Sequence, residues 1–129
     1  MIVDTSALLA ILLYEPEAPT FARAIERAAT VRISAASYLG AAIVIDNQHD
    51  AIRSAMLDRF LAEFDIRIEP VTVEQIRIAR QAFRSFGKGM GPAGLNFGDC
   101  LTYALAAVTR EPLLFKGDDF TKTDLPPAL

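Results

Sequence analysis

This chain of 129 residues contains one cysteine and one histidine, and it has no long apolar run. The lone Cys100 cannot form an internal disulfide bond, which favours a reducing compartment. A membrane span needs about 20 consecutive apolar residues, and every apolar run here is much shorter. The first residues have no basic flank and include an acid, Asp4, so the sequence predicts no signal peptide. We therefore expect a cytoplasmic protein with no membrane partner.

Basic residues are also few compared with acidic ones. The 13 Lys and Arg residues are outnumbered by 16 Asp and Glu residues, which gives a net charge of −3. This balance argues against a broad basic surface for nucleic acid, although it permits a local one. Apolar residues, in contrast, make up 52% of the chain, which excludes a disordered protein. So high a fraction fits either a partner that covers part of the surface or a well-filled core.

The apolar pattern predicts strands that alternate with helices. We expect strands at 2–4, 31–33, 66–71 and 112–116, and helices at 6–14, 18–29, 35–45, 51–64, 73–86 and 97–108. This order is typical of an α/β fold with a mostly parallel sheet covered by helices on both faces. No repeat or linker divides the chain, so we expect a single domain over 1–129.

Acidic residues recur where the predicted strands end or a helix begins. Asp4 follows the first strand, Asp99 begins the helix at 97–108, and Asp118 and Asp119 follow the last strand. In a parallel sheet these positions share the edge at which ligands bind. Carboxylates about 4 Å apart repel by roughly 4 kcal/mol at an effective dielectric of about 20, and a divalent cation offsets that repulsion. Oxygen ligands without His or Cys favour Mg²⁺, or alternatively Mn²⁺, and such a site suits phosphodiester hydrolysis.

Each acid also has a simpler structural interpretation. Asp4 can be the N-cap of the first helix, and Asp99 can interact favourably with a helix dipole. Asp118 and Asp119 suit a solvated turn. The convergence of these acids at one edge of one plausible topology is what favours a shared site.

Four segments of the chain resemble PIN-domain ribonucleases of the VapC toxin type: MIVDTSALLAIL, ISAASYL, FGKGMGPAGLNFGDCLTYALA and PLLFKGDDF. The resemblance covers nearly the whole chain. It implies a PIN-like three-layer α/β/α sandwich, Mg²⁺-dependent cleavage of RNA, a homodimer and a VapB-like antitoxin. By position, Asp4 and Asp99 match the family's metal-binding aspartates, and Asp118 or Asp119 matches its fourth acid. Ser6 matches a hydroxyl residue that supports a ligand or a water molecule.

Gly40 departs from the family pattern, which carries a glutamate at this position. Glycine supplies neither a ligand nor a base, and it weakens a helix by up to about 1 kcal/mol relative to alanine. The nearest downstream acid, Asp46, points to a different face of the helix. We therefore expect cleavage to be impaired by a factor on the order of 10²–10⁴. The alternative is a catalytically inactive PIN-domain protein that binds RNA, antitoxin or both.

Basic residues near the acids are the candidate RNA contacts. Arg84 and Lys88 precede Asp99 in the sequence and could hold a phosphate. Lys116, close to the acidic pair, could do the same or simply balance charge. The glycine-rich loop at 87–94 lacks the Gly-Lys-Ser/Thr signature of a phosphate-binding loop, so we interpret it as a connection between helices.

Overall fold

The structure is a computed structural model that describes residues 1–129, and its sheet has four strands. The strands are β1 (Ile2–Val3), β2 (Val31–Ser34), β3 (Ile66–Glu69) and β4 (Leu113–Leu114). Their order is β3-β2-β1-β4 and every pair is parallel, so the predicted parallel sheet is confirmed. Three strands are shorter than the predicted 2–4, 66–71 and 112–116. β3 ends at Glu69 because its partner β2 ends at the paired Ser34, and Pro70 has no N–H to extend the pairing.

All six predicted helices are present; 73–86 has its predicted ends, and the others differ by one or two residues at one or both ends. They are α1 (Thr5–Leu12), α2 (Ala18–Arg27), α3 (Ala35–Asp46), α4 (Ala51–Glu63), α5 (Val73–Phe86) and α6 (Phe97–Thr109). Side-chain caps set several of the starts. The Ser34 hydroxyl accepts from the N–H of Ala36 at 3.2 Å and so begins α3 directly after β2. None of the helices is both long and apolar enough to cross a membrane.

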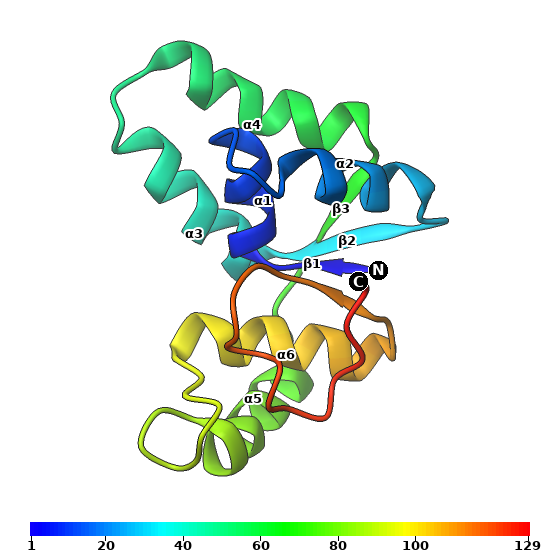
Figure 1. Ribbon diagram of the computed structural model, residues 1–129. Coiled ribbons are helices and arrows are strands. Elements are labelled where there is room, and N and C mark those ends of the chain that lie inside the picture. The colour runs from blue at the N-terminus through cyan, green and yellow to red at the C-terminus, as the bar shows by residue number, and fades with distance from the viewer.

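The helices form a layer on each face of the sheet (Figure 1). Neighbouring residues of a strand point to opposite faces, and Val3 packs into a core shared with α1 to α4. Ile2 packs into a second core with side chains of α5 and α6. The expected three-layer α/β/α sandwich is therefore confirmed. Helix α3 contacts α1 and α4 in one layer and α6 in the other.

The pairing of β1 with β4 places Asp4 beside the C-terminal segment. Val3 lies opposite Leu114, and the N–H of Asp4 donates to the carbonyl of Leu114 at 2.9 Å. The chain then passes through bends and turns at 117–122, so Asp118 and Asp119 lie in a turn. Asp4, the segment after β4 and the start of α6 consequently meet at the carboxyl edge of the sheet.

Candidate active site

A cavity of about 520 Å³ opens at this edge of the sheet. Asp4, Asp99 and Asp119 all line it, although they come from three separate parts of the chain, and Gly40 lines it from α3. Asp118 does not line the cavity and is exposed to solvent. The fold therefore brings together three of the four candidate acids with Gly40, the position at which the family resemblance predicts a glutamate.

Asp4 is both the N-cap of α1 and a wall of the cavity. Its side chain is 94% shielded, since the residue retains only 6% of its accessible surface. Oδ2 accepts from the N–H of Ser6 at 3.0 Å and from the Ser6 hydroxyl at 2.6 Å. Oδ1 accepts from the Thr102 hydroxyl at 2.7 Å. The capping interpretation and the site interpretation of Asp4 are therefore compatible.

Two buried hydroxyl residues that we did not single out in the sequence extend this network. Thr102 is 1% exposed, and its Oγ1 lies 2.8 Å from Oγ of Ser37. Because the Thr102 proton is directed to Asp4, Ser37 donates to Thr102. One sequence signal could have identified Thr102: it follows Asp99 by three residues and so lies on the same face of α6. These hydroxyls hold the Asp4 carboxylate in one orientation.

Asp99 sits in the first turn of α6 and forms a reciprocal cap with Asn96. The N–H of Asn96 donates to Oδ2 of Asp99 at 3.0 Å, and the N–H of Asp99 donates to Oδ1 of Asn96 at 2.8 Å. Burial, and then the negative charges of Asp4 and Asp119, raise the pKa of Asp99 to about 6, while the Asn96 N–H opposes the rise. Asp99 therefore lies close enough to Asp4 and to Asp119 for their negative charges to disfavour its ionised form.

Gly40 leaves room where a side chain would enter the cavity. A Cβ atom at this position would lie 3.5 Å from Oγ1 of Thr5 and 3.8 Å from Cγ2 of Thr5, which are ordinary contacts. The Cβ atom of a larger residue at position 40 therefore fits without any shift of the neighbouring atoms. Asp46 does not compensate, because it is exposed, accepts from the Ser54 hydroxyl at 2.8 Å and does not line the cavity.

The donor chemistry of the cavity suits a hard divalent cation. Its acidic donors are oxygens alone, with no His or Cys among the lining residues. No group of three or more His, Cys, Asp or Glu side chains is close enough to hold a metal ion. Mg²⁺ is commonly held by one or two carboxylates with water completing its shell, and Asp4 and Asp99 could supply that number.

The structure places one of the candidate RNA-binding residues in the wall of the cavity and the other three outside it. Ser6 lines it, and its Oγ accepts from the backbone N–H of Lys116 at 3.0 Å. The Lys116 ammonium is paired with Glu15 and, at 3.2 Å, with Glu17. An RNA contact by Lys116 stays a prediction, and it requires the ammonium to leave these carboxylates. Arg84 and Lys88 are exposed near the end of α5 and do not line the cavity.

The Asp99→Asn variant should be more stable than the parent chain in metal-free buffer at pH 7.5. A raised carboxyl pKa means that ionised Asp99 destabilises the fold, and the penalty grows as the pH rises from about 4 through about 6. After allowance for solvent screening we expect a gain of about 1 kcal/mol in the free energy of unfolding. Thermal melting in EDTA measures it, and the gain should shrink steadily from pH 6 to pH 4. A gain that is independent of pH would contradict this explanation.

Comparison with known proteins identifies the family. The family model for the PIN domain matches residues 1–125. Ribonuclease VapC28 of Mycobacterium tuberculosis is 54% identical over 130 residues, covering 100% of this chain and 98% of the relative. Ribonuclease VapC42 of the same species is 46% identical over 129 residues, covering 99% and 98%.

Solved structures show the same fold at low sequence identity. The crystal structure of Mycobacterium tuberculosis VapC20, a toxin that cleaves the sarcin-ricin loop, matches with a TM-score of 0.78 and 15% identity over 96% of this chain and 95% of that one. A toxin–antitoxin complex from Klebsiella pneumoniae matches with a TM-score of 0.73 and 15% identity, covering 95% and 92%. With the full-length relatives, these findings show that the chain belongs to the VapC ribonucleases of the PIN-domain family.

Proposed function

We propose that this protein is a Mg²⁺-dependent endoribonuclease toxin whose cleavage of RNA is impaired by Gly40. One observation carries the proposal: in a chain of the VapC family, Asp4, Asp99 and Asp119 line one cavity together with Gly40. The arrangement offers anionic oxygens on several sides of a space large enough for a phosphate group. We place its action in the cytoplasm, where RNA substrates are available.

In this proposal Asp4 and Asp99 bind the ion directly, and Asp119 acts through water or a second ion. Mg²⁺, when bound, supplies water activation and neutralises the charge that develops on the scissile phosphate. Ser6 and Thr102 keep both oxygens of Asp4 fixed by hydrogen bonds. Asp99 must lose its proton before it can bind a cation, so its pKa of about 6 leaves it mostly ionised at neutral pH. Gly40 contributes no acid or base.

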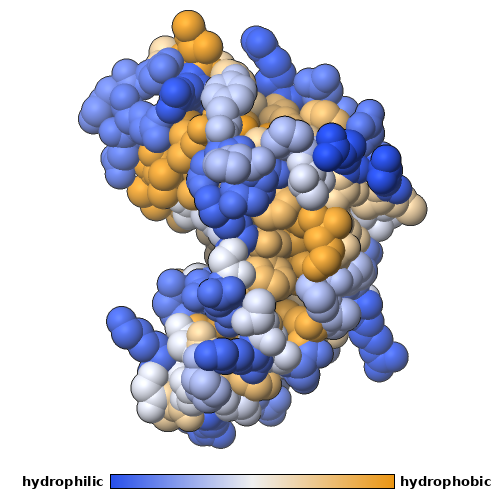
Figure 2. Space-filling model, in the orientation of Figure 1, coloured by the Kyte–Doolittle hydropathy of each residue, from blue (hydrophilic) through white to orange (hydrophobic).

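We also propose that a VapB-like antitoxin neutralises the protein and that the chain forms a homodimer. A free nuclease would harm its own cell, so a partner should cover the acidic cavity. Exposed apolar side chains on α3 and α4 support the presence of protein partners, because Leu39, Ile43 and Ile52 are 59%, 51% and 74% exposed. Figure 2 shows hydrophobic surface gathered over α3. An Arg or Lys of the antitoxin could bind the carboxylates by charge-assisted hydrogen bonds.

Cleavage of labelled RNA by the purified chain, with Mg²⁺ or with EDTA, tests the enzymatic proposal. We expect slow cleavage in Mg²⁺, none in EDTA, and products that carry a 5′-phosphate and a 3′-hydroxyl. The same assay with Mn²⁺ should also give cleavage. Cleavage that continues in EDTA would show that a metal-independent mechanism operates.

The alternative function is a catalytically inactive protein that binds RNA or antitoxin, and the missing side chain at Gly40 favours it. Binding of Mg²⁺ and of RNA, measured beside cleavage, separates the two functions. Tight binding of RNA or of a VapB-like peptide with no detectable cleavage in Mg²⁺ would favour the inactive protein.

A further inference from the structure

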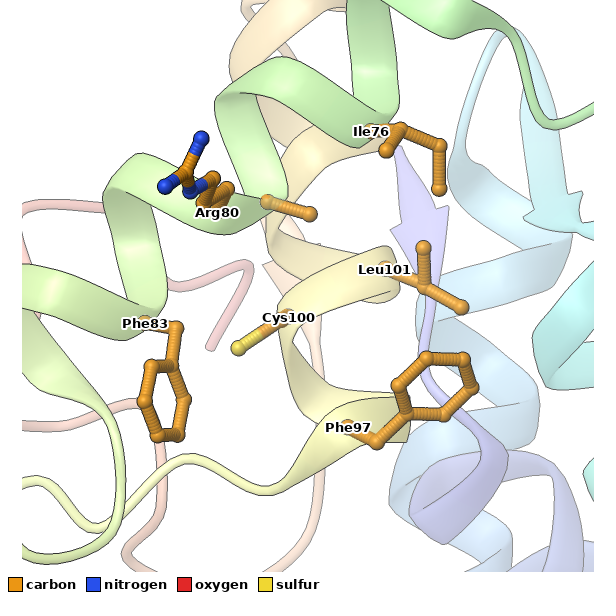
Figure 3. A pocket seen from close by; sticks show the side chains of 7 residues that line it. Ile76, Arg80, Phe83, Phe97, Cys100 and Leu101 are labelled. Atoms are coloured by element: carbon orange, nitrogen blue, oxygen red, sulfur yellow. The ribbon is translucent and has the colours of Figure 1, made fainter.

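A second cavity lies between α5 and α6, directly beside the acidic one. Its volume is about 340 Å³, and nearly all of its wall is apolar (Figure 3). The residues that line this groove are Ile76, Ala79, Arg80, Phe83, Phe97, Cys100 and Leu101. The acidic residues of the active-site cavity do not line it, so it requires an explanation of its own.

Phe97 connects the two cavities. It is the first residue of α6, lies two positions before Asp99, and lines both the groove and the acidic cavity. Its side chain is 82% exposed, the highest value among the large apolar residues of this chain. In Figure 3 the rings of Phe97 and Phe83 lie on either side of Cys100. An aromatic ring left in solvent next to a nuclease site offers a flat face to a base.

The groove is bordered by the basic part of an acidic protein. Residues 75–98 contain four cationic side chains and no acidic one, although the whole chain has a net charge of −3. Three of the four, Arg77, Arg80 and Arg84, lie within about 60° of one another around α5. The fourth is Lys88, and none of the four takes part in an ion pair. Unpaired cations beside an apolar surface complement the phosphates and bases of single-stranded RNA.

We propose that this groove holds a nucleobase of the RNA next to the cleaved phosphate, with Phe97 as the stacking platform. Arg80 and Arg84 then bind phosphates along α5 and direct the strand towards Asp99. The inference builds on the proposed ribonuclease function and adds a residue that positions the RNA strand beside the acidic cavity. An apolar protein segment could also fill the groove, but it would leave the row of arginines without a counterpart.

An abasic scan of RNA binding tests this proposal without cleavage. Fluorescence anisotropy in EDTA measures the affinity for a short labelled single-stranded RNA in which one position at a time lacks its base. Removal of the base at one position of the RNA should weaken binding to the parent chain about tenfold or more. Phe97→Ala should weaken binding to the intact RNA by a similar factor and should show no further loss with that abasic probe. Phe97→Tyr keeps a ring and should bind like the parent, whereas Phe97→Leu should not.

The salt dependence of binding distinguishes the ring from the arginines. Arg80→Ala or Arg84→Ala should each reduce the slope of log affinity against log salt by about 0.7, while Phe97→Ala should leave the slope unchanged. The proposal would be overturned if no abasic position weakens binding to the parent and Phe97→Ala binds the intact RNA as tightly as the parent does. So would an altered sedimentation coefficient of Phe97→Ala at unchanged RNA affinity, because the groove would then contact a second copy of the chain.

The outcomes also separate this inference from the proposed function. If Phe97→Ala binds RNA like the parent while the chain cleaves RNA in Mg²⁺, the stacking site is wrong and the ribonuclease stands. If an abasic position weakens binding but neither the parent nor Gly40→Glu cleaves RNA, the stacking site stands and the catalytic proposal is wrong. Absence of RNA binding by the parent, together with absence of cleavage in Mg²⁺ by the parent and by Gly40→Glu, would overturn both.

Discussion

Gly40→Glu should increase the rate of RNA cleavage in Mg²⁺ by about 10²–10⁴-fold, the range that a positioned acid or base contributes. Position 40 lines the acidic cavity, and a Cβ there meets only Thr5 at ordinary contact distances. The new carboxylate can therefore enter the site without rebuilding α3. Single-turnover cleavage of a labelled RNA by the parent and the variant measures the effect, and EDTA should abolish the gain.

Two matched variants isolate the carboxylate. Gly40→Gln has nearly the same shape without the charge, and Gly40→Ala removes only the helix-weakening effect of glycine, about 1 kcal/mol. Neither should restore cleavage, although both should raise the melting temperature. Equal cleavage rates for the parent and Gly40→Glu would show that position 40 is not the cause of impairment. A full gain with Gly40→Gln would show that the charge is not what matters.

Asp4→Ala should lower the free energy of unfolding by about 3 kcal/mol, because it removes a helix cap and takes the acceptor away from one buried donor and two half-buried donors. Those donors are the N–H and hydroxyl of Ser6 and the hydroxyl of Thr102. Urea denaturation in EDTA measures this loss independently of metal. A loss below about 0.5 kcal/mol would mean that the network around Asp4 is not important for stability.

Asp4→Asn separates the structural role of Asp4 from its proposed role in metal binding. The amide keeps the shape and one oxygen, and the Thr102 hydroxyl can turn to accept from the amide nitrogen, so we expect a cost of only about 1 kcal/mol. The increase in melting temperature that Mg²⁺ gives the parent should nevertheless disappear. In the Gly40→Glu background, cleavage should fall at least about 100-fold. Undiminished Mg²⁺-dependent cleavage by that double variant would contradict direct binding of the ion by Asp4.

The sequence determined the elements and the edge of the sheet at which the acids gather. Helix 73–86 was predicted with its observed ends, and the helix predicted at 35–45 begins where it was expected. These predictions succeed because hydrophobic periodicity and capping depend on residues only a few positions apart. The family resemblance also depends on local motifs, and the full-length relatives confirm it.

Only the tertiary structure decided which side chains share the site. It placed Asp119 rather than Asp118 at the cavity and paired the Lys116 ammonium with Glu15 and Glu17. It also joined Thr102 to Asp4, 98 positions away, through a buried hydrogen bond. Such contacts depend on how layers pack and on which face of a turn a residue occupies, and neither has a local signature in the chain. Phe97 shows the same limit, because its place at α6 was predictable but its exposure between two cavities was not.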